Sequence, residues 1–200
     1  MTAATRTTIV NLALRELGAT RVDDYTENSP EGVIARDCWE QAVRKALARH
    51  EWQFALKGAE LARSATTPTT RFAYRYTLPG DFVRLAAVSA VSTMYPRLDQ
   101  DGGFVLRDGS IDTDSETVFV EYVYDAPAIG TWTPWFTDVL VADLASVMAS
   151  PLKSTTERER LEQLGEKRLR EGRGIDSVQK SQRSVLLPGG WRSAARGGWR

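Results

Sequence analysis

The spacing of apolar residues changes twice along this 200-residue chain, and these changes restrict the possible fold more than any other feature. In residues 1–66 apolar side chains recur every three or four positions, which is typical of helices. In residues 67–132 they alternate with polar ones, as in Val118–Tyr124, which is typical of strands. Helical spacing returns in residues 133–174, and regular spacing ends in residues 175–200. The sequence therefore predicts an N-terminal helical part, a β-rich insertion, a C-terminal helical part and a flexible basic tail.

Start and stop signals predict two helices before the insertion. One of the adjacent threonines Thr7 and Thr8 is suited to cap the first helix, and Gly18 is suited to end it. Ser29-Pro30 is a second start signal, with serine as the cap and proline as the first helical residue. This second helix is predicted to run to about His50.

Two turn signals organise the predicted insertion. Pro79-Gly80 separates two apolar runs, and we expect it to turn the first pair of strands. Asp108-Gly109 separates two further runs and is typical of a tight hairpin. The insertion is therefore expected to be one small antiparallel sheet of about four or five strands.

Two more helices are predicted after the insertion. Thr133-Pro134 starts the first of them, and Pro151 is expected to end it. The second runs from about Thr156 to Glu171 and has few large apolar residues, so it is either mostly solvated or docked on a neighbouring subunit. Neither helical part buries its apolar stripe alone, so the two must pack together. The predicted fold is α+β and mainly α, with a four-helix body, a small antiparallel β insertion and an extended C-terminal tail.

Charge and cysteine content restrict the setting of the protein. The net charge is zero, but Lys167–Arg200 holds nine basic and two acidic residues, so this end carries +7 and the rest −7. A basic end favours an acidic partner, either nucleic acid or an acidic protein surface. Cys38 is the only cysteine, which excludes an internal disulfide and favours a reducing compartment. Asp138 and Asp143 interrupt the apolar stretch Pro134–Leu152, and no signal peptide is recognisable, so we expect no membrane partner.

The sequence offers little for catalysis or metal binding. His50, the only histidine, lies at a predicted helix end, where stabilising the terminal carbonyls is the commoner role. Cys38 lies on the small-residue face of the second helix, where packing in the core is expected. The acidic residues between Asp99 and Asp114 suggest a calcium loop but lack the glycine and glutamate positions of an EF-hand, so turn-forming aspartates explain them better. We expect no enzyme activity and no cofactor.

The tail is the strongest candidate for binding a partner. It contains a short apolar segment and a Gly-Gly-Trp-Arg sequence that occurs twice, and tryptophan and arginine are enriched among binding hot spots. The apolar segment is also suited to add as a strand to the edge of a partner's sheet. Two alternatives stay open, namely a disordered tail with no binding role and stacking on single-stranded nucleic acid. The candidate residues are Val185, Leu186, Leu187, Trp191, Arg192, Trp199 and Arg200.

Three segments of the N-terminal half occur in a characteristic order, namely Asn11–Gly18, Trp52–Ala55 and Tyr74–Arg84. In order and spacing they resemble the head-to-tail adaptor proteins of tailed bacteriophages, the family that includes tail tubular protein A. The resemblance covers about the first 90 residues, and the second half is similar only in its general layout. The residues that carry it are expected to be structural, and they are Leu12, Leu17, Gly18, Trp52, Phe54, Tyr76, Leu78, Pro79, Asp81 and Phe82.

The resemblance implies a virion structural protein that is made in the host cytoplasm and acts in the neck between capsid and tail. Adaptors of this family form a ring of twelve subunits under the portal protein, extend the DNA channel and provide the platform for a tail or nozzle protein. The resemblance implies that the C-terminal segment binds the portal. It is also compatible with a protein that is monomeric when free and forms the ring on the portal. The alternatives are another neck or tail accessory protein and a DNA-binding packaging module.

Overall fold

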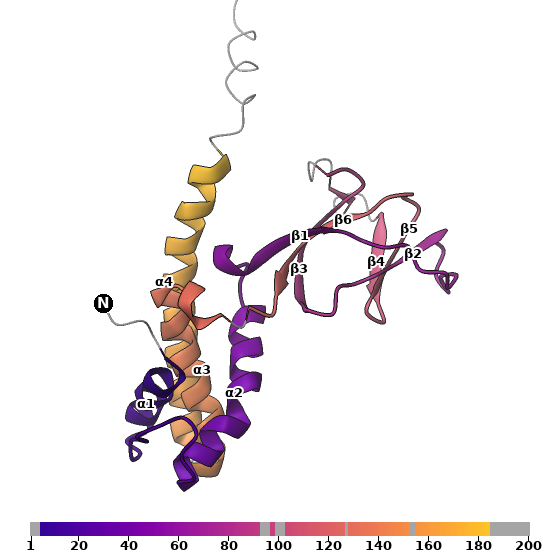
Figure 1. Ribbon diagram of the computed structural model, residues 1–200. Coiled ribbons are helices and arrows are strands. Elements are labelled where there is room, and N and C mark those ends of the chain that lie inside the picture. The colour runs from indigo at the N-terminus through magenta and orange to yellow at the C-terminus, as the bar shows by residue number, and fades with distance from the viewer. Residues whose placement is uncertain (1–4, 93–96, 99–102, 127, 153–154, 185–200) are drawn as a thin grey trace, which may run out of the picture.

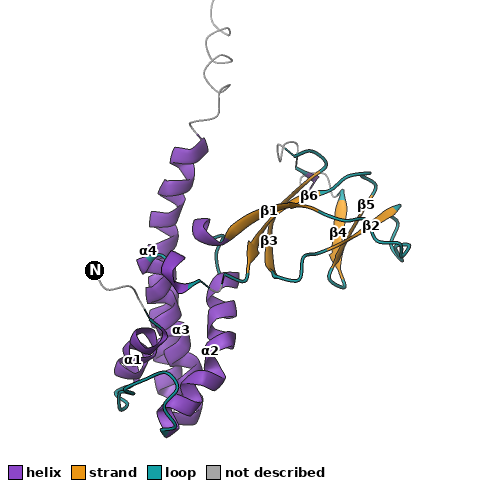
Figure 2. Cartoon of the chain, viewed as in Figure 1, coloured by secondary structure: helices purple, strands orange, loops and turns teal. Residues whose placement is uncertain are grey.

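The computed structural model describes residues 5–92, 97–98, 103–126, 128–152 and 155–184. The helices gather in one elongated part of the molecule and the strands in a lobe beside it (Figure 1 and Figure 2). We call these the helical part and the β lobe. The residues proposed to bind a partner through the tail, Val185 to Arg200, lie outside the described residues.

Helix α3 (Pro134–Leu152) is the centre of the helical part. It packs against α1 (Arg6–Leu17), α2 (Pro30–Ala48) and α4 (Thr155–Ser184). Because the other helices cover it on several sides, α3 is apolar around much of its circumference. Its buried leucines and alanines are Leu140, Ala142, Leu144, Ala145 and Ala149. The two halves of the sequence with helical spacing therefore pack together as predicted. Among the described residues, no helix has the length and apolar character needed to cross a membrane.

The ends of α1 and α2 follow the sequence signals closely, with one shift. Ser29 caps α2 and Pro30 is its first residue, and Gly18 ends α1 in the left-handed conformation with φ of 60°. The cap of α1 is Thr5, which accepts a hydrogen bond from the backbone of Thr8. The prediction of Thr7 or Thr8 as the cap is wrong, because α1 begins two or three residues earlier than the apolar spacing indicated.

The β lobe contains two three-stranded antiparallel sheets, so the prediction of a four-helix body with one small β insertion is wrong. The fold is α+β. The first sheet has the order β1-β6-β3 and the second the order β2-β5-β4. The strands are β1 (Leu56–Glu60), β2 (Tyr74–Thr77), β3 (Phe82–Ser89), β4 (Phe104–Arg107), β5 (Ser110–Thr113) and β6 (Phe119–Tyr124).

Strand β1 was missed because Leu-Lys-Gly-Ala-Glu contains no β-branched or aromatic residue. Its backbone is ordered by pairing with β6 over all five of its residues, from Leu56 opposite Val123 to Glu60 opposite Phe119. Tertiary pairing therefore overrides the weak local preference. The short 3₁₀ turn Gln53–Ala55 leads from the end of the helical part directly into this strand.

The segment around Pro79-Gly80 connects the two sheets and does not form a hairpin. Strand β2 before it pairs with β5, and strand β3 after it pairs with β6. The prediction that Pro79-Gly80 turns the first pair of one sheet is therefore wrong. Alternation of apolar residues identifies strands but not their partners, and these partners lie more than thirty residues along the chain. Asp108-Gly109, with both φ angles positive, does form the predicted hairpin between β4 and β5.

Helix α4 is much longer than predicted and runs through Ser184, beyond the expected end at Glu171. Its last turns extend past the other helices (Figure 1). Gly172 does not end the helix, and a Cβ at this position would lie 3.4 Å from side-chain atoms of both Trp52 and Trp135. The tail was predicted to begin at residue 175, whereas residues 175–184 continue the helix.

Candidate functional site: the docked base of the projecting helix

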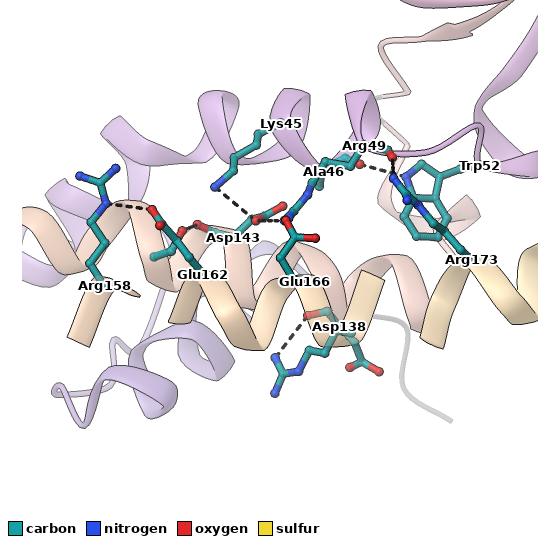
Figure 3. A network of polar contacts seen from close by, with 12 residues as sticks. Lys45, Ala46, Arg49, Trp52, Asp138, Asp143, Arg158, Glu162, Glu166 and Arg173 are labelled. Carbon is teal, nitrogen blue, oxygen red and sulfur yellow. Dashed lines mark hydrogen bonds and ion pairs between the residues drawn. The ribbon is translucent and has the colours of Figure 1, made fainter. Parts of the chain in front are cut away.

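A polar seam fixes α4 against α2 and α3 (Figure 3). At its centre lies the carboxylate of Asp143 on α3, which is 1% exposed and accepts a hydrogen bond from Arg49. Lys45 Nζ lies 3.3 Å from the same oxygen, Oδ1. Arg49 also forms an ion pair with Glu166 on α4. One arginine at the end of α2 therefore joins three helices around a buried carboxylate.

The backbone of α4 comes close to this seam. A Cβ at Gly165 would lie 3.4 Å from Arg49 NH1 and from Asp143 Oδ1, so the absence of a side chain lets α4 approach the ion pair. Two turns further on, Arg173 donates a hydrogen bond to the carbonyl of Arg49 (Figure 3). The residue that joins the helices is thus held through both its side chain and its backbone.

A second buried carboxylate docks the projecting end of α4. Asp176 is 1% exposed, and its Oδ2 lies 3.1 Å from His50 Nε2 and accepts a hydrogen bond from the backbone N–H of Gln53 at 3.3 Å. The His50 ring packs edge-on against Trp52, with 4.9 Å between the ring centroids. The predicted interaction of His50 with terminal carbonyls is thus replaced by contact with a carboxylate 126 residues further along the chain.

His50 gives the stability of the protein a pH dependence near neutrality. Burial lowers the pKa of His50 below its ordinary value of 6.5, and Asp176 offsets only part of this effect. The folded chain therefore binds fewer protons at this site than the unfolded chain does, so stability falls as the pH falls through 6.5. We expect the free energy of unfolding in urea to decrease from about pH 7 to about pH 5.5. His50→Gln should flatten this dependence, and an unchanged slope in the variant would show that another group causes it.

Helix α1 supplies a third anchor for α4. Arg168 NH2 donates a hydrogen bond to Glu16 Oε1 at 2.8 Å, and Arg168 NH1 donates to the carbonyl of Asp138 on α3 at 3.2 Å. Arg160 donates to the carbonyl of Glu16 at 3.0 Å. Contacts from α1, α2 and α3 therefore fix the direction in which the free end of α4 points.

The projecting end of α4 presents apolar side chains to solvent. Ile175 and Val178 are 48% and 60% exposed, and their spacing of three residues puts them on the same side of the helix. Asp176 between them faces the helical part. This end of the helix leads at Ser184 into the basic tail, so an exposed apolar surface and the candidate binding segment are adjacent in the chain.

The residues that carry the resemblance to phage adaptors lie in two separate places. One group packs in the core of the helical part and the other in the β lobe, so they do not form a single site. Most are buried or half-buried, which fits the structural role expected for them. The helical group is Leu12, Leu17, Gly18, Trp52 and Phe54, and the group in the β lobe is Tyr76, Leu78, Pro79, Asp81 and Phe82.

Asp81 forms hydrogen bonds that join the segment between β2 and β3 to the first sheet. Its Oδ2 accepts a hydrogen bond from Lys57 Nζ on β1 at 2.8 Å, and its Oδ1 accepts one from the Tyr122 hydroxyl on β6 at 2.9 Å. Its carbonyl accepts from the N–H of Asp125 at 2.8 Å. The hydrogen bond from Lys57 holds the pKa of Asp81 below its ordinary value of 3.8, so the carboxylate is charged near neutral pH.

Asp81→Ala is expected to lower the free energy of unfolding by about 1 kcal/mol, because the hydroxyl of the buried Tyr122 loses its partner. Asp81→Asn keeps an acceptor for that hydroxyl and should cost less. Urea denaturation of both variants measures the difference. An alanine variant no less stable than the asparagine variant would show that this hydrogen bond contributes nothing.

The other residues considered for chemistry have structural partners. Asp112 is buried and accepts hydrogen bonds from Arg75 at 2.7 and 2.9 Å, and Asp114 accepts one from the backbone of Ala73. Cys38 is half-buried on α2, and burial raises the pKa of its thiol. Among the described residues, no three potential ligands from histidine, cysteine and the acidic residues gather into a group able to hold a metal.

Sequence reasoning did not identify the residues that dock α4. Asp143 was noted only because it interrupts an apolar stretch, although a single acidic residue in an otherwise apolar helix often indicates a buried partner. That partner, Arg49, lies 94 residues earlier, so spacing along the chain could not identify it. Neither any known family model nor any curated protein matches this chain.

Proposed function

We propose that this chain is a head-to-tail adaptor of a tailed bacteriophage, a structural protein of the virion neck. The observation that carries the proposal is the geometry of α4. The helix is anchored by two buried carboxylates, Asp143 on α3 and its own Asp176, and Ile175 and Val178 beside Asp176 are exposed. Its last turns extend past the other helices (Figure 1). It leads directly into a basic segment. A rigid arm that presents a binding segment suits a protein that connects two larger assemblies.

In this proposal, copies of the chain form a ring of twelve beneath the portal protein. The helical part supplies contacts between subunits, and the β lobe faces the tail or nozzle protein. Double-stranded DNA passes through the ring without specific binding. Outside Lys167–Arg200 the chain carries a net charge of −7, and such a surface does not retain the DNA backbone.

The tail binds the portal through its tryptophans and arginines. A segment of this kind loses its conformational entropy only when it meets its receptor, which makes each single contact weak. Twelve such contacts on one ring act together through their high effective concentration. Trp191 and Trp199 are the expected anchors, because each is followed by arginine in the repeated Gly-Gly-Trp-Arg sequence.

Deletion of Gly189–Arg200 is expected to abolish binding to the purified portal protein of the same phage. Urea denaturation of the deletion variant is the control that separates loss of the binding segment from loss of the fold. Trp191→Ala and Trp199→Ala should each weaken binding by about thirtyfold, the size typical of a hot spot. Ser193→Ala, in the same segment, is the matched control and should bind normally. Unchanged portal binding by the deletion variant would contradict this role of the tail.

A further inference from the structure

The chain enters the β lobe through one short segment. Helix α2 ends at Ala48, the 3₁₀ turn Gln53–Ala55 follows, and β1 begins directly after this turn at Leu56. Strand β1 lies at an edge of the first sheet, with β6 as its neighbour, and its composition gives little local preference for a strand. Contacts that hold the turn Gln53–Ala55 therefore help to order the start of β1.

The last turns of α4 hold this entrance to the β lobe. The buried carboxylate of Asp176 lies 3.1 Å from His50 Nε2 and accepts a hydrogen bond at 3.3 Å from the N–H of Gln53, the first residue of the turn. One helical turn earlier, a Cβ at Gly172 would lie 3.4 Å from the Trp52 ring, so the helix backbone packs against this ring. Because a buried carboxylate is unfavourable without its partners, these contacts favour one position of the helix.

The same stretch of α4 is open to solvent on its other side. Ile175 and Val178 are exposed, and they lie on either side of Asp176 in the sequence. A partner that covers Ile175 and Val178 would restrict the motion of these turns and so keep Asp176 in place. This stretch of the helix therefore contacts the entrance to the β lobe on one side and is available to a partner on the other.

The base of the first sheet is also packed into the helical part. Val123 on β6 is buried in the core of the helical part, and Leu56 and Val83, at the starts of β1 and β3, pack against that core. The next two residues of β1 are exposed. The packed base keeps the β lobe in place, so loss of the Asp176 contacts is expected to loosen β1 and the end of α4 and not to release the lobe.

We propose that the contact of Asp176 with His50 and Gln53 is a latch that couples the end of α4 to strand β1. With the latch closed, the two elements stabilise each other, and when it opens both become more mobile. Such coupling is reciprocal, so a change that stabilises one element stabilises the other through the latch. The role of the latch rests on the proposed function: portal binding at the end of α4 would order β1 in the lobe that faces the tail protein.

Hydrogen exchange of the full-length chain tests the latch. Asp176→Ala should speed exchange by about tenfold both at Arg173–Val178 and at Leu56–Glu60, because the contact between these segments is made by a charged group. Exchange in the second sheet, β2-β5-β4, should not change. Asp176→Asn keeps an acceptor for the N–H of Gln53 and should have a smaller effect. Glu171→Ala, at an exposed position on the same helix, is the matched control and should change neither segment. No change in Asp176→Ala, faster exchange at Arg173–Val178 alone, or faster exchange in both sheets would overturn the proposal.

Substitution of Gly58 in β1 tests the reciprocity of the coupling. Gly58 is exposed, and a Cβ there would lie 3.9 Å from the carbonyl oxygen of Val120, so valine fits and favours the strand. Gly58→Val should slow exchange at Arg173–Val178 by about threefold, and Gly58→Pro, which removes a strand N–H, should speed it. Neither substitution should affect α4 in an Asp176→Ala background. Unchanged exchange in α4 in either single variant, or an effect that persists without Asp176, would overturn the coupling.

Both measurements use the chain alone. Failure of the latch therefore leaves portal binding to be judged by its own test, and failure of portal binding leaves the exchange results to be judged on their own.

Discussion

Trp52→Ala is expected to lower the free energy of unfolding by about 4 kcal/mol. The Trp52 side chain is fully buried where the helical part meets the β lobe, and its ring packs edge-on against Phe136 with 5.4 Å between centroids. Its indole N–H donates to the carbonyl of Ala46 at 2.9 Å. Alanine would leave a large cavity next to Gly172, where the backbone of α4 packs against the Trp52 ring. Urea denaturation followed by circular dichroism measures the loss.

Trp52→Phe is the matched variant, because it keeps most of the aromatic volume and removes the hydrogen bond to Ala46. It should cost about 2 kcal/mol, mainly from the carbonyl left without a partner. If the two variants were equally stable, the cavity would contribute nothing and the packing role of Trp52 would be wrong.

Asp143→Ala is expected to lower the free energy of unfolding by about 3 kcal/mol, because it leaves Arg49 without its buried partner. The Arg49 side chain is 16% exposed, so water compensates only partly for the lost carboxylate. The same substitution should increase hydrogen exchange along α4, because Arg49 also pairs with Glu166 and accepts the hydrogen bond of Arg173. With these contacts to α2 and α3 weakened, the last turns of α4 would be held less rigidly against the helical part.

Asp138→Ala is the matched control for this experiment. Asp138 lies on the same helix, its side chain is exposed, and its contact with Arg168 is made through the backbone carbonyl, which alanine retains. The control should change stability by less than about 0.5 kcal/mol. Equal losses in the two variants would show that the buried ion pair does not stabilise the helical part.

Local signals in the sequence predicted the helices well, because caps and glycine stops act within one turn. Ser29, Pro30 and Gly18 mark the ends of α1 and α2 as expected. The end of the last helix was predicted at about Glu171, whereas the helix continues through Gly172, whose backbone lies close to Trp52. A glycine in a helix costs about 1 kcal/mol relative to alanine, so local preference disfavours the helix at Gly172 and tertiary packing overrides it.

The sheets were predicted less well, because pairing depends on residues far apart in the sequence. The alternation near Tyr76 and Phe82 correctly predicted two strands, but nothing local shows that they belong to different sheets. Strand β1 has a composition that is poor for strands, and only its pairing with β6 defines it. Several contacts that dock α4, such as His50 with Asp176, likewise join residues more than a hundred positions apart.

Electron microscopy of the full-length chain mixed with the purified portal protein of the same phage tests the proposed function most directly. We expect an added collar of twelvefold symmetry on one face of the portal, with the projecting ends of α4 directed toward the portal. Portal particles without added density would contradict the adaptor function, and so would a chain that binds only to DNA added to the same mixture.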